Sequence, residues 1–147
     1  MREILFRAKR KRWCKFSEYE WWVEGYYVKY QPCASKDEWI YGIIPKYASD
    51  LYIVEIDPET LCQFTGLKDK NGKRIWEDDI VLCKKYLDGN FVECHIELGF
   101  VEMKYGAYGL HRFKQNAYYR PFKDWLEDYE YEVIGNCFDN PELLKGE

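Results

Sequence analysis

Short runs of aromatic and β-branched residues, separated by glycine, proline, asparagine and aspartate, recur along the whole chain. Phenylalanine, tryptophan and tyrosine make up 19% of the residues, and these side chains suit the half-buried surface of a β-sheet. The runs follow one another at spacings of about eight to twelve residues, which is typical of small β-barrels and sandwiches. We therefore expect a mainly β fold, β-rich α+β at most.

The order of the runs predicts two subdomains: a strand-rich β-meander over residues 1–60, packed on an SH3-like barrel or roll over residues 61–147. The strands expected in the first are residues 1–8, 18–30, 38–44 and 51–56, followed by a turn at 57–60. Those expected in the second are residues 63–67, 74–85, 91–98, 100–105, 108–113 and 131–137, with one helical turn at 122–126 and a terminal turn at 140–144.

Alternation and glycine placement add detail to this plan. In the first strand we expect Ile4, Phe6 and Ala8 to face inward, since alternate residues of a strand point to the same side. Gly25 predicts a turn or bulge within its run, and hence a hairpin or a bent strand. Gly99 is expected to separate two strands in the same way.

The segment over residues 65–81, TGLKDKNGKRIWEDDIV, looks at first like a phosphate-binding loop. It lacks the spacing of such a loop, and no long helix follows it. Asn71 and Gly72 together are a strong hairpin signal, and Gly66 provides a second bend. We interpret the segment as a turn between two strands.

Glu77, Asp78 and Asp79 are three consecutive acidic residues. Calcium loops alternate their ligands so that the oxygens converge on one point, and consecutive residues do not converge. We expect Asp78 and Asp79 to form a tight turn and to cap the backbone where the next strand begins. No metal and no cofactor are expected.

The cysteines and histidines offer weak signals for chemistry. The six cysteines stand at positions 14, 33, 62, 83, 94 and 137, with no C-x-x-C pair, so zinc is weakly supported. Cys94 and His95 are adjacent and would point to opposite faces of a strand. A hydrolase that uses His95 or His111 as its base stays open as an alternative.

The net charge of −4 excludes a surface that is basic throughout. Lys9, Arg10, Lys11 and Arg12 nevertheless form a local basic run, and the last part of the chain is acidic. One interpretation is a weak attraction between the two ends. The other is a basic arm that contacts phosphates or an acidic partner, with exposed aromatic rings stacking on bases.

Six segments together resemble the YopX family of bacteriophage and prophage proteins. They are MREILFRA (1–8), WVEGYYV (22–28), VEIDPET (54–60), TGLKDKNGK (65–73), IV (80–81) and YEVIGN (131–136). The resemblance implies a phage or prophage gene, a bacterial cytoplasm and a mainly β fold, with no established biochemical role and no catalytic residue to carry over. The family commonly has glycine where this chain has Asp78, and aspartate accepts left-handed backbone geometry better than most residues.

From these features we expect a cytoplasmic, non-catalytic accessory protein that acts through protein contacts. Its partner would be a second copy of itself or a phage or host protein. Nucleic-acid binding through residues 9–12 is the alternative, and it is not favoured. A membrane location is not expected, because no run approaches the length that crosses a bilayer.

Overall fold

The computed structural model describes residues 3–33, 37–47, 50–87, 90–112, 119–122 and 129–145. The chain forms two compact units, Met1–Phe64 and Thr65–Glu147. Its described part contains eleven strands and two short 3₁₀ helices, so the expectation of a mainly β fold is confirmed. That residues 1–60 and 61–147 are separate subdomains stays a prediction.

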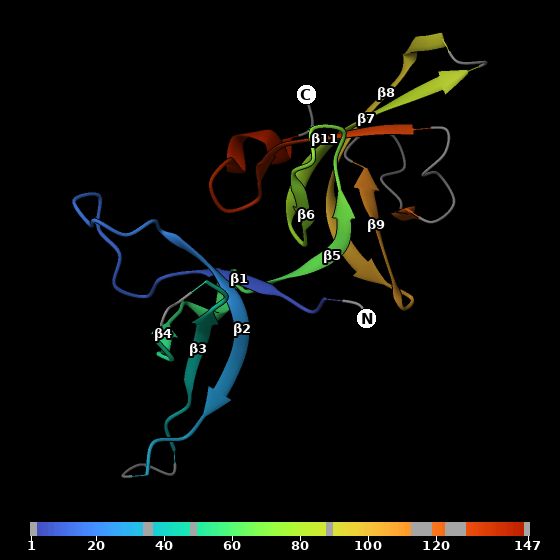
Figure 1. The fold of residues 1–147 in the computed structure, drawn as a ribbon. Helices are drawn as coiled ribbons and strands as arrows, with labels where there is room; N and C mark the ends of the chain where they lie inside the picture. Colours follow the sequence, from blue (N-terminus) through green and yellow to red (C-terminus); the bar gives the residue numbers. More distant parts are fainter. Residues whose placement is uncertain are drawn as a thin grey trace. The chain divides into compact units, whose positions relative to one another are not determined.

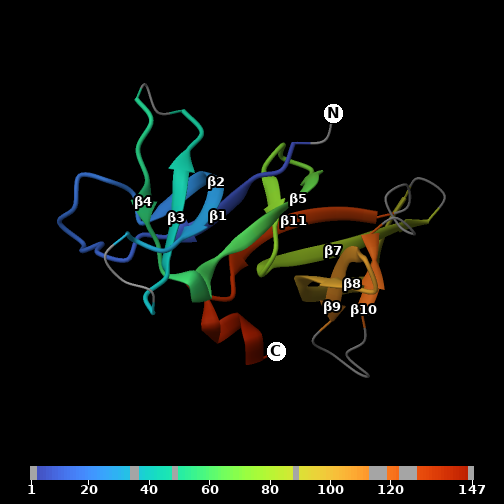
Figure 2. The ribbon, with the colours of Figure 1, turned by 90° about the horizontal axis from the view of Figure 1, so that it is seen from below.

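One antiparallel sheet organises the N-terminal unit. Its elements are β1 (Phe6–Lys9), β2 (Trp22–Tyr30), β3 (Ile40–Pro45), β4 (Val54–Glu55), the 3₁₀ helix η1 (Pro58–Thr60) and the start of β5 (Cys62–Lys68). The strand order is β4-β3-β2-β1-β5, so β1 to β4 form a meander and β5 pairs with the other edge of β1. The succession from β4 to β1 can be followed in Figure 2.

The core of the N-terminal unit lies on one face of this sheet. It comprises buried Ala8, Val23, Ile43 and Ile56, with partly buried Phe6, Tyr27, Tyr41, Val54 and Leu61 packed against them. These residues come from five elements or their immediate flanks, and alternation along each strand brings them to one side. Apolar burial of this kind is the main favourable term that holds such a sheet together.

The prediction that Ile4 faces inward is wrong. Its side chain is 57% exposed, and Leu5 next to it is fully buried. Lys9, on the same side of the strand as Leu5, is buried too, and its Nζ lies 3.5 Å from the centre of the Trp21 ring. Both sides of β1 are therefore covered: Phe6 and Ala8 face the core as expected, and an aromatic ring covers the cation of Lys9 on the other side.

Gly25 does not end a strand. β2 continues through it for nine residues, and Figure 1 shows β2 as one curved ribbon, so the hairpin alternative is wrong. Gly25 is opposite Pro45 of β3, and a Cβ atom at this position would lie 2.0 Å from the carbonyl oxygen of Ile44. Glycine is required here by the close approach of the neighbouring backbone.

The segment between β3 and β5 is less regular than expected. Only Val54–Glu55 of the strand predicted at 51–56 forms β4. The turn predicted at 57–60 is the single turn of η1, where Asp57 Oδ1 accepts the backbone N–H of Glu59 at 3.1 Å. A short carboxylate before the first helical residue is a favourable cap.

The C-terminal unit contains a second antiparallel sheet. The strands of this unit are the rest of β5 and β6 (Arg74–Trp76), which extend the first sheet, and β7 (Asp79–Leu87), β8 (Asn90–Lys104), β9 (Ala107–Arg112), β10 (Tyr119–Pro121) and β11 (Tyr129–Asn136), which form the second. The 3₁₀ helix η3 (Pro141–Lys145) follows. The sheet order is β10-β9-β8-β7-β11, and β6 pairs with β5. The core comprises Ile75, Val81, Cys83, Val101, Tyr108, Leu110, Phe122 and Tyr131.

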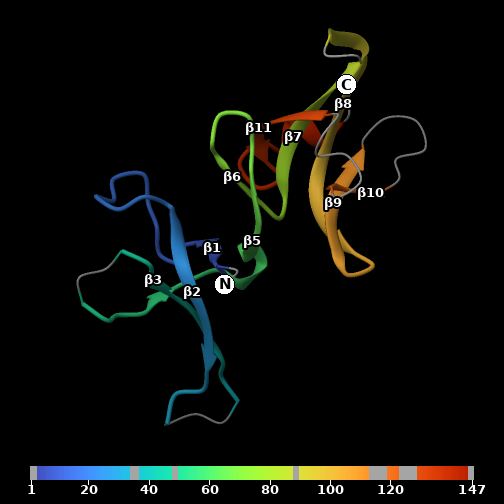
Figure 3. The ribbon, with the colours of Figure 1, turned by 45° about the vertical axis from the view of Figure 1, so that its right-hand side comes forward.

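Two predicted boundaries in this unit are wrong. β8 runs unbroken through Gly99, where an added Cβ would lie 2.4 Å from the carbonyl oxygen of His111 in β9. Conversely, the strand predicted at 74–85 is divided into β6 and β7 at Asp78. As expected from the strands predicted at 100–105 and 108–113, β8 and β9, labelled in Figure 3, form a hairpin. It closes at Tyr105 and Gly106, which both have positive φ.

Among the described strands, β10 and β11 are the two edges of the C-terminal sheet and do not pair with each other. The SH3-like barrel expected for this half stays a prediction. The helical turn expected at 122–126 lies largely outside the described residues.

Candidate functional site

Asp69 connects the turn between β5 and β6 to β11 through hydrogen bonds. Its Oδ1 accepts the backbone N–H groups of Asn71 and Lys73, each at 2.9 Å, and its Oδ2 accepts that of Val133 at 3.0 Å. Gly72 has φ 79° and donates its N–H to the Asp69 carbonyl at 3.0 Å. The turn residues are therefore held by hydrogen bonds within the protein.

These contacts change the acidity of the buried carboxyl group. Burial by itself raises the pKa of Asp69, but the N–H donors of Val133, Lys73 and Asn71 and the charge of Lys73 outweigh it. The net pKa of Asp69 is lower than its ordinary value of 3.8. The carboxylate form is thus the one that the fold binds.

Gly66 bends β5 in the left-handed region, with φ 88°. Beside it, the Thr65 hydroxyl donates to the carbonyl oxygen of Ile75 at 2.7 Å and accepts the N–H of Leu67 at 3.1 Å. The hydroxyl replaces backbone pairing that the bend removes.

Asp78 lies between β6 and β7, and Asp79 is the first residue of β7. Asp78 has φ 64°, and its backbone N–H donates to Val101 while its carbonyl accepts from Cys137. Asp79 is 1% exposed, and its Oδ2 accepts the N–H of Trp76 at 2.8 Å. In the part of the chain that the structure describes, no group of three or more His, Cys, Asp or Glu residues is placed to share a metal.

Burial and the same two aspartates determine the acidity of Cys137. Burial and the charges of Asp78 and Asp79 raise the pKa of the Cys137 thiol to about 12. The thiolate is the nucleophile in alkylation, so this cysteine should react slowly. Cys14 and Cys33 are exposed.

We expect iodoacetamide at about pH 8 to modify Cys14 and Cys33 and to leave Cys137 unmodified until the protein is unfolded. Peptide mapping by mass spectrometry, before and after denaturation in guanidinium, measures each site separately. Modification of Cys137 in the native protein at the rate of Cys14 would contradict the assigned pKa.

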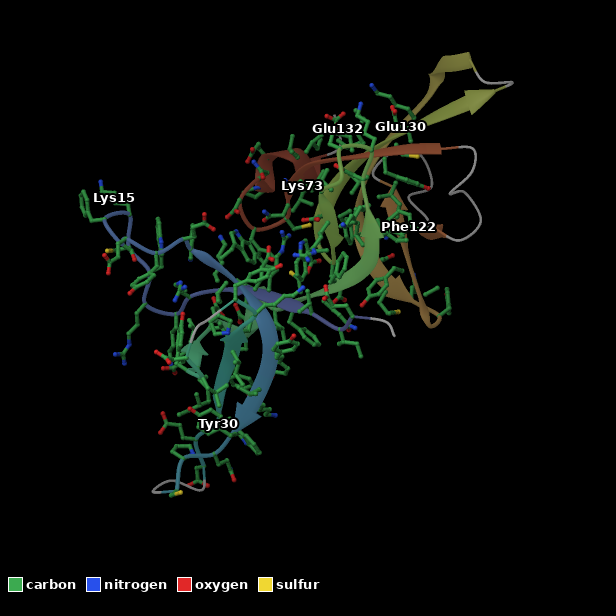
Figure 4. The ribbon with its side chains drawn as sticks, in the orientation of Figure 1. Lys15, Tyr30, Lys73, Phe122, Glu130 and Glu132 are labelled. Carbon is green, nitrogen blue, oxygen red and sulfur yellow. The ribbon has the colours of Figure 1, made fainter. Side chains whose placement is uncertain are left out.

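Lys70 belongs to the same turn between β5 and β6, and its ammonium group lies near two carboxylates. Its Nζ lies 3.6 Å from Glu130 Oε2 and 3.5 Å from Glu132 Oε2. Both glutamates project from the same side of β11 in Figure 4, as alternate residues of a strand must. These partly exposed ion pairs contribute little stability.

Internal contacts occupy much of the basic run. Lys9 is buried against Trp21, and the Arg10 Nε donates to the Glu20 carbonyl at 2.9 Å. The Nζ of Lys11 forms an ion pair with Glu55 at 2.9 Å. Lys9 is therefore covered, and nucleic-acid binding through residues 9–12 stays a prediction.

The structure describes the side chain of His111 and its contacts. His111 Nδ1 lies 3.0 Å from Glu102 Oε1, and its ring stacks on Phe100 with 4.7 Å between centres. These are the contacts of a hydrogen-bonded histidine inside a sheet. His95 and Cys94 belong to β8, but their side chains lie outside the described residues, so the hydrolase alternative stays a hypothesis.

A cavity of about 280 Å³ opens in the N-terminal unit and is the candidate functional site. Its lining residues are Lys11, Trp39, Tyr41, Glu55, Ile56, Asp57 and Pro58. Tyr41 belongs to β3, and Trp39 directly precedes this strand. The two residues are two positions apart, so their rings lie on the same side of the sheet. The pairing of β3 with β4 brings Glu55, Ile56 and Asp57 beside these two rings.

Sequence reasoning missed this cavity. The available signal was the presence of two aromatic residues at strand spacing, Trp39 and Tyr41, together with the alternating acidic and apolar segment EIDP, residues 55–58. That signal identifies no site by itself, because the β3–β4 register determines whether the two segments meet.

Comparison with known proteins gives one positive finding. The family model described as YopX protein matches residues 6–145, nearly the whole chain. A search among curated proteins found no match. No helix in the described part of the chain is long and apolar enough to cross a membrane.

Proposed function

The chain belongs to the YopX family, and from that premise we propose that it is a phage or prophage accessory protein of the bacterial cytoplasm. It acts without catalysis, through protein contacts made by its N-terminal unit, and it self-associates. The observation that carries this proposal is the uneven distribution of exposed apolar side chains between the described parts of the two units.

In the described part of the N-terminal unit, eleven large apolar side chains are exposed, whereas the described part of the C-terminal unit has four. The eleven are Ile4, Phe16, Tyr19, Trp21, Tyr26, Tyr30, Trp39, Tyr47, Leu51, Tyr52 and Ile53. Single exposed apolar residues are ordinary, but this many in one small unit favours an interaction surface. Tyrosine and tryptophan are also the residues enriched at protein interfaces.

Self-association is best supported around the start of β4. Leu51, Tyr52 and Ile53 lie next to one another and are 85%, 48% and 45% exposed. They lead into a two-residue strand at the edge of the sheet. An apolar edge segment pairs readily with a second copy of itself, because two antiparallel copies bring the same residues together.

We expect the double variant Leu51→Lys, Ile53→Lys to raise the dissociation constant of the dimer at least about tenfold, since two copies would place lysines opposite one another. Multi-angle light scattering over a range of protein concentrations measures this. The matched control is Leu144→Lys, an exposed leucine of η3 in the other unit, which should leave the dimer unchanged. Wild-type particles of 17.9 kDa at every concentration would contradict self-association.

A further inference from the structure

Aromatic, aliphatic and proline side chains line the cavity in the N-terminal unit together with charged ones. Tyr41 and Ile56 belong to the core of the unit, and Pro58 is exposed at the start of η1. Trp39 is 47% exposed. It directly precedes Ile40, which pairs with Tyr30 at the far end of β2, labelled in Figure 4. The apolar walls are thus partly open to a partner.

The size of the cavity limits what it can hold. At about 280 Å³ it lies just below the usual range of ligand pockets, which suits one or two side chains of a peptide better than a whole cofactor. Aromatic-lined grooves of this kind bind proline-rich segments, whose extended backbone is already ordered before binding.

The cavity lining carries both signs of charge, with Glu55 and Asp57 acidic and Lys11 basic. The sequence segments that contribute its aromatic and acidic residues, 37–41 and 55–59, contain five acidic residues and no basic one. Glu55 is paired with Lys11 at 2.9 Å, whereas Asp57 uses one oxygen to cap η1. The second oxygen of Asp57 can therefore accept a hydrogen bond from a cationic side chain.

The aromatic wall already attracts one cation from within the protein. The Nζ of Lys29 lies 4.5 Å from the centre of the Trp39 ring and 5.5 Å from that of Tyr41. Ring faces of this kind favour an ammonium or guanidinium group. A partner cation could displace Lys29, which is exposed, and use the same face together with Asp57.

We propose that this cavity binds an extended, proline-containing segment of a partner protein that carries a basic side chain. The prolines pack against Trp39 and Pro58, and the basic side chain lies between the Trp39 ring and Asp57. This inference rests on the proposed function, because it names the chemistry of the partner that the N-terminal unit would contact.

The test is isothermal titration calorimetry with two acetylated, amidated peptides, Ala-Pro-Pro-Arg-Pro-Pro-Ala and the same sequence with glutamate in place of arginine. The arginine peptide should bind at least about tenfold more tightly than the glutamate peptide, and less tightly as salt is added. Trp39→Ala should weaken binding about tenfold or more. Tyr47→Ala, which removes an aromatic ring that is 78% exposed and does not line the cavity, should have no effect.

Asp57→Asn is the second variant and should weaken binding about fivefold or more, because asparagine still caps η1 but lacks the charge. If Trp39→Ala does not fold, judged by its circular dichroism, this variant decides. Equal affinity for the two peptides, no binding of the arginine peptide at millimolar concentration, or unchanged affinity in both variants would overturn the proposal. Displacement of the peptide by a thymidine oligonucleotide at equal concentration would also overturn it, in favour of nucleic acid.

The outcome is separable from that of the proposed function. Light scattering of the wild type tests self-association without any peptide. A dimer that does not bind the arginine peptide would leave the proposed function standing and remove this inference alone.

Discussion

Replacing Asp69 with alanine should lower the free energy of unfolding by about 4 kcal/mol, because three backbone N–H groups lose a charged acceptor. The carboxylate is 8% exposed, so water cannot easily take its place. Two of the donors, Asn71 and Lys73, shape the turn, and the third, Val133, connects the turn to β11. The loss should therefore reach beyond the turn into the five-stranded sheet.

Urea denaturation followed by circular dichroism measures this effect. The control is Glu142→Ala, an exposed acidic residue of η3, which should change the free energy by less than about 0.5 kcal/mol. Asp69→Asn should also destabilise the protein, since an amide has one acceptor oxygen and would present its own N–H₂ to one of the donors. A loss below about 1 kcal/mol in Asp69→Ala would show that these bonds contribute little.

The same residue predicts a pH dependence. The folded pKa of Asp69 lies below its ordinary value of 3.8, so its contribution is fully present above that value and is lost as the pH falls through the folded pKa. In Asp69→Ala the part of the acid-induced loss of stability that comes from protonation of this carboxylate should be missing. The difference in unfolding free energy between wild type and variant should therefore shrink only at acidic pH below 3.8. A difference that is constant down to the folded pKa and below it would contradict the assignment.

Gly25→Ala should lower the free energy of unfolding by about 3 kcal/mol or prevent the N-terminal unit from folding. A Cβ atom there would lie 2.0 Å from the carbonyl oxygen and 2.8 Å from the carbonyl carbon of Ile44. Both are backbone atoms of a paired strand, so the clash cannot be relieved by a side-chain rotation. β2 and β3 would have to separate locally, with loss of ladder hydrogen bonds.

Tryptophan fluorescence during urea denaturation suits this measurement, because four of the six tryptophans belong to the N-terminal unit. Tyr26→Ala is the matched control: it changes the next residue of the same strand, whose side chain is 49% exposed. Its effect should be well below that of Gly25→Ala. Equal stability of Gly25→Ala and the wild type would mean that the two strands are not this close in solution.

Local backbone preferences could be recognised without the structure. Gly72 and Asp78 both have positive φ, and asparagine, aspartate and glycine are the residues that tolerate it. The succession of aromatic runs likewise indicated a mainly β chain, since strand periodicity is written in neighbouring residues. The family resemblance also rested on these short segments.

The role of a glycine or a lysine could not be recognised where it depends on a contact with a distant part of the sequence. Gly25 was expected to make a hairpin or a bent strand and Gly99 to separate two strands, yet both lie within continuous strands against a neighbouring backbone. Lys9 was a candidate contact in the nucleic-acid alternative, and it is buried beneath Trp21. In each case the deciding contact comes from another strand, and a single segment contains no information about it.

By itself, therefore, the sequence determined the class of the fold, the family and the positions where the backbone can turn, because these depend on residues close together in the chain. Only the tertiary structure decided which glycines admit a neighbouring strand, which cations are covered and that Trp39 meets Asp57 at one cavity. Those features arise from strand register, and register is set by the packing of whole sheets.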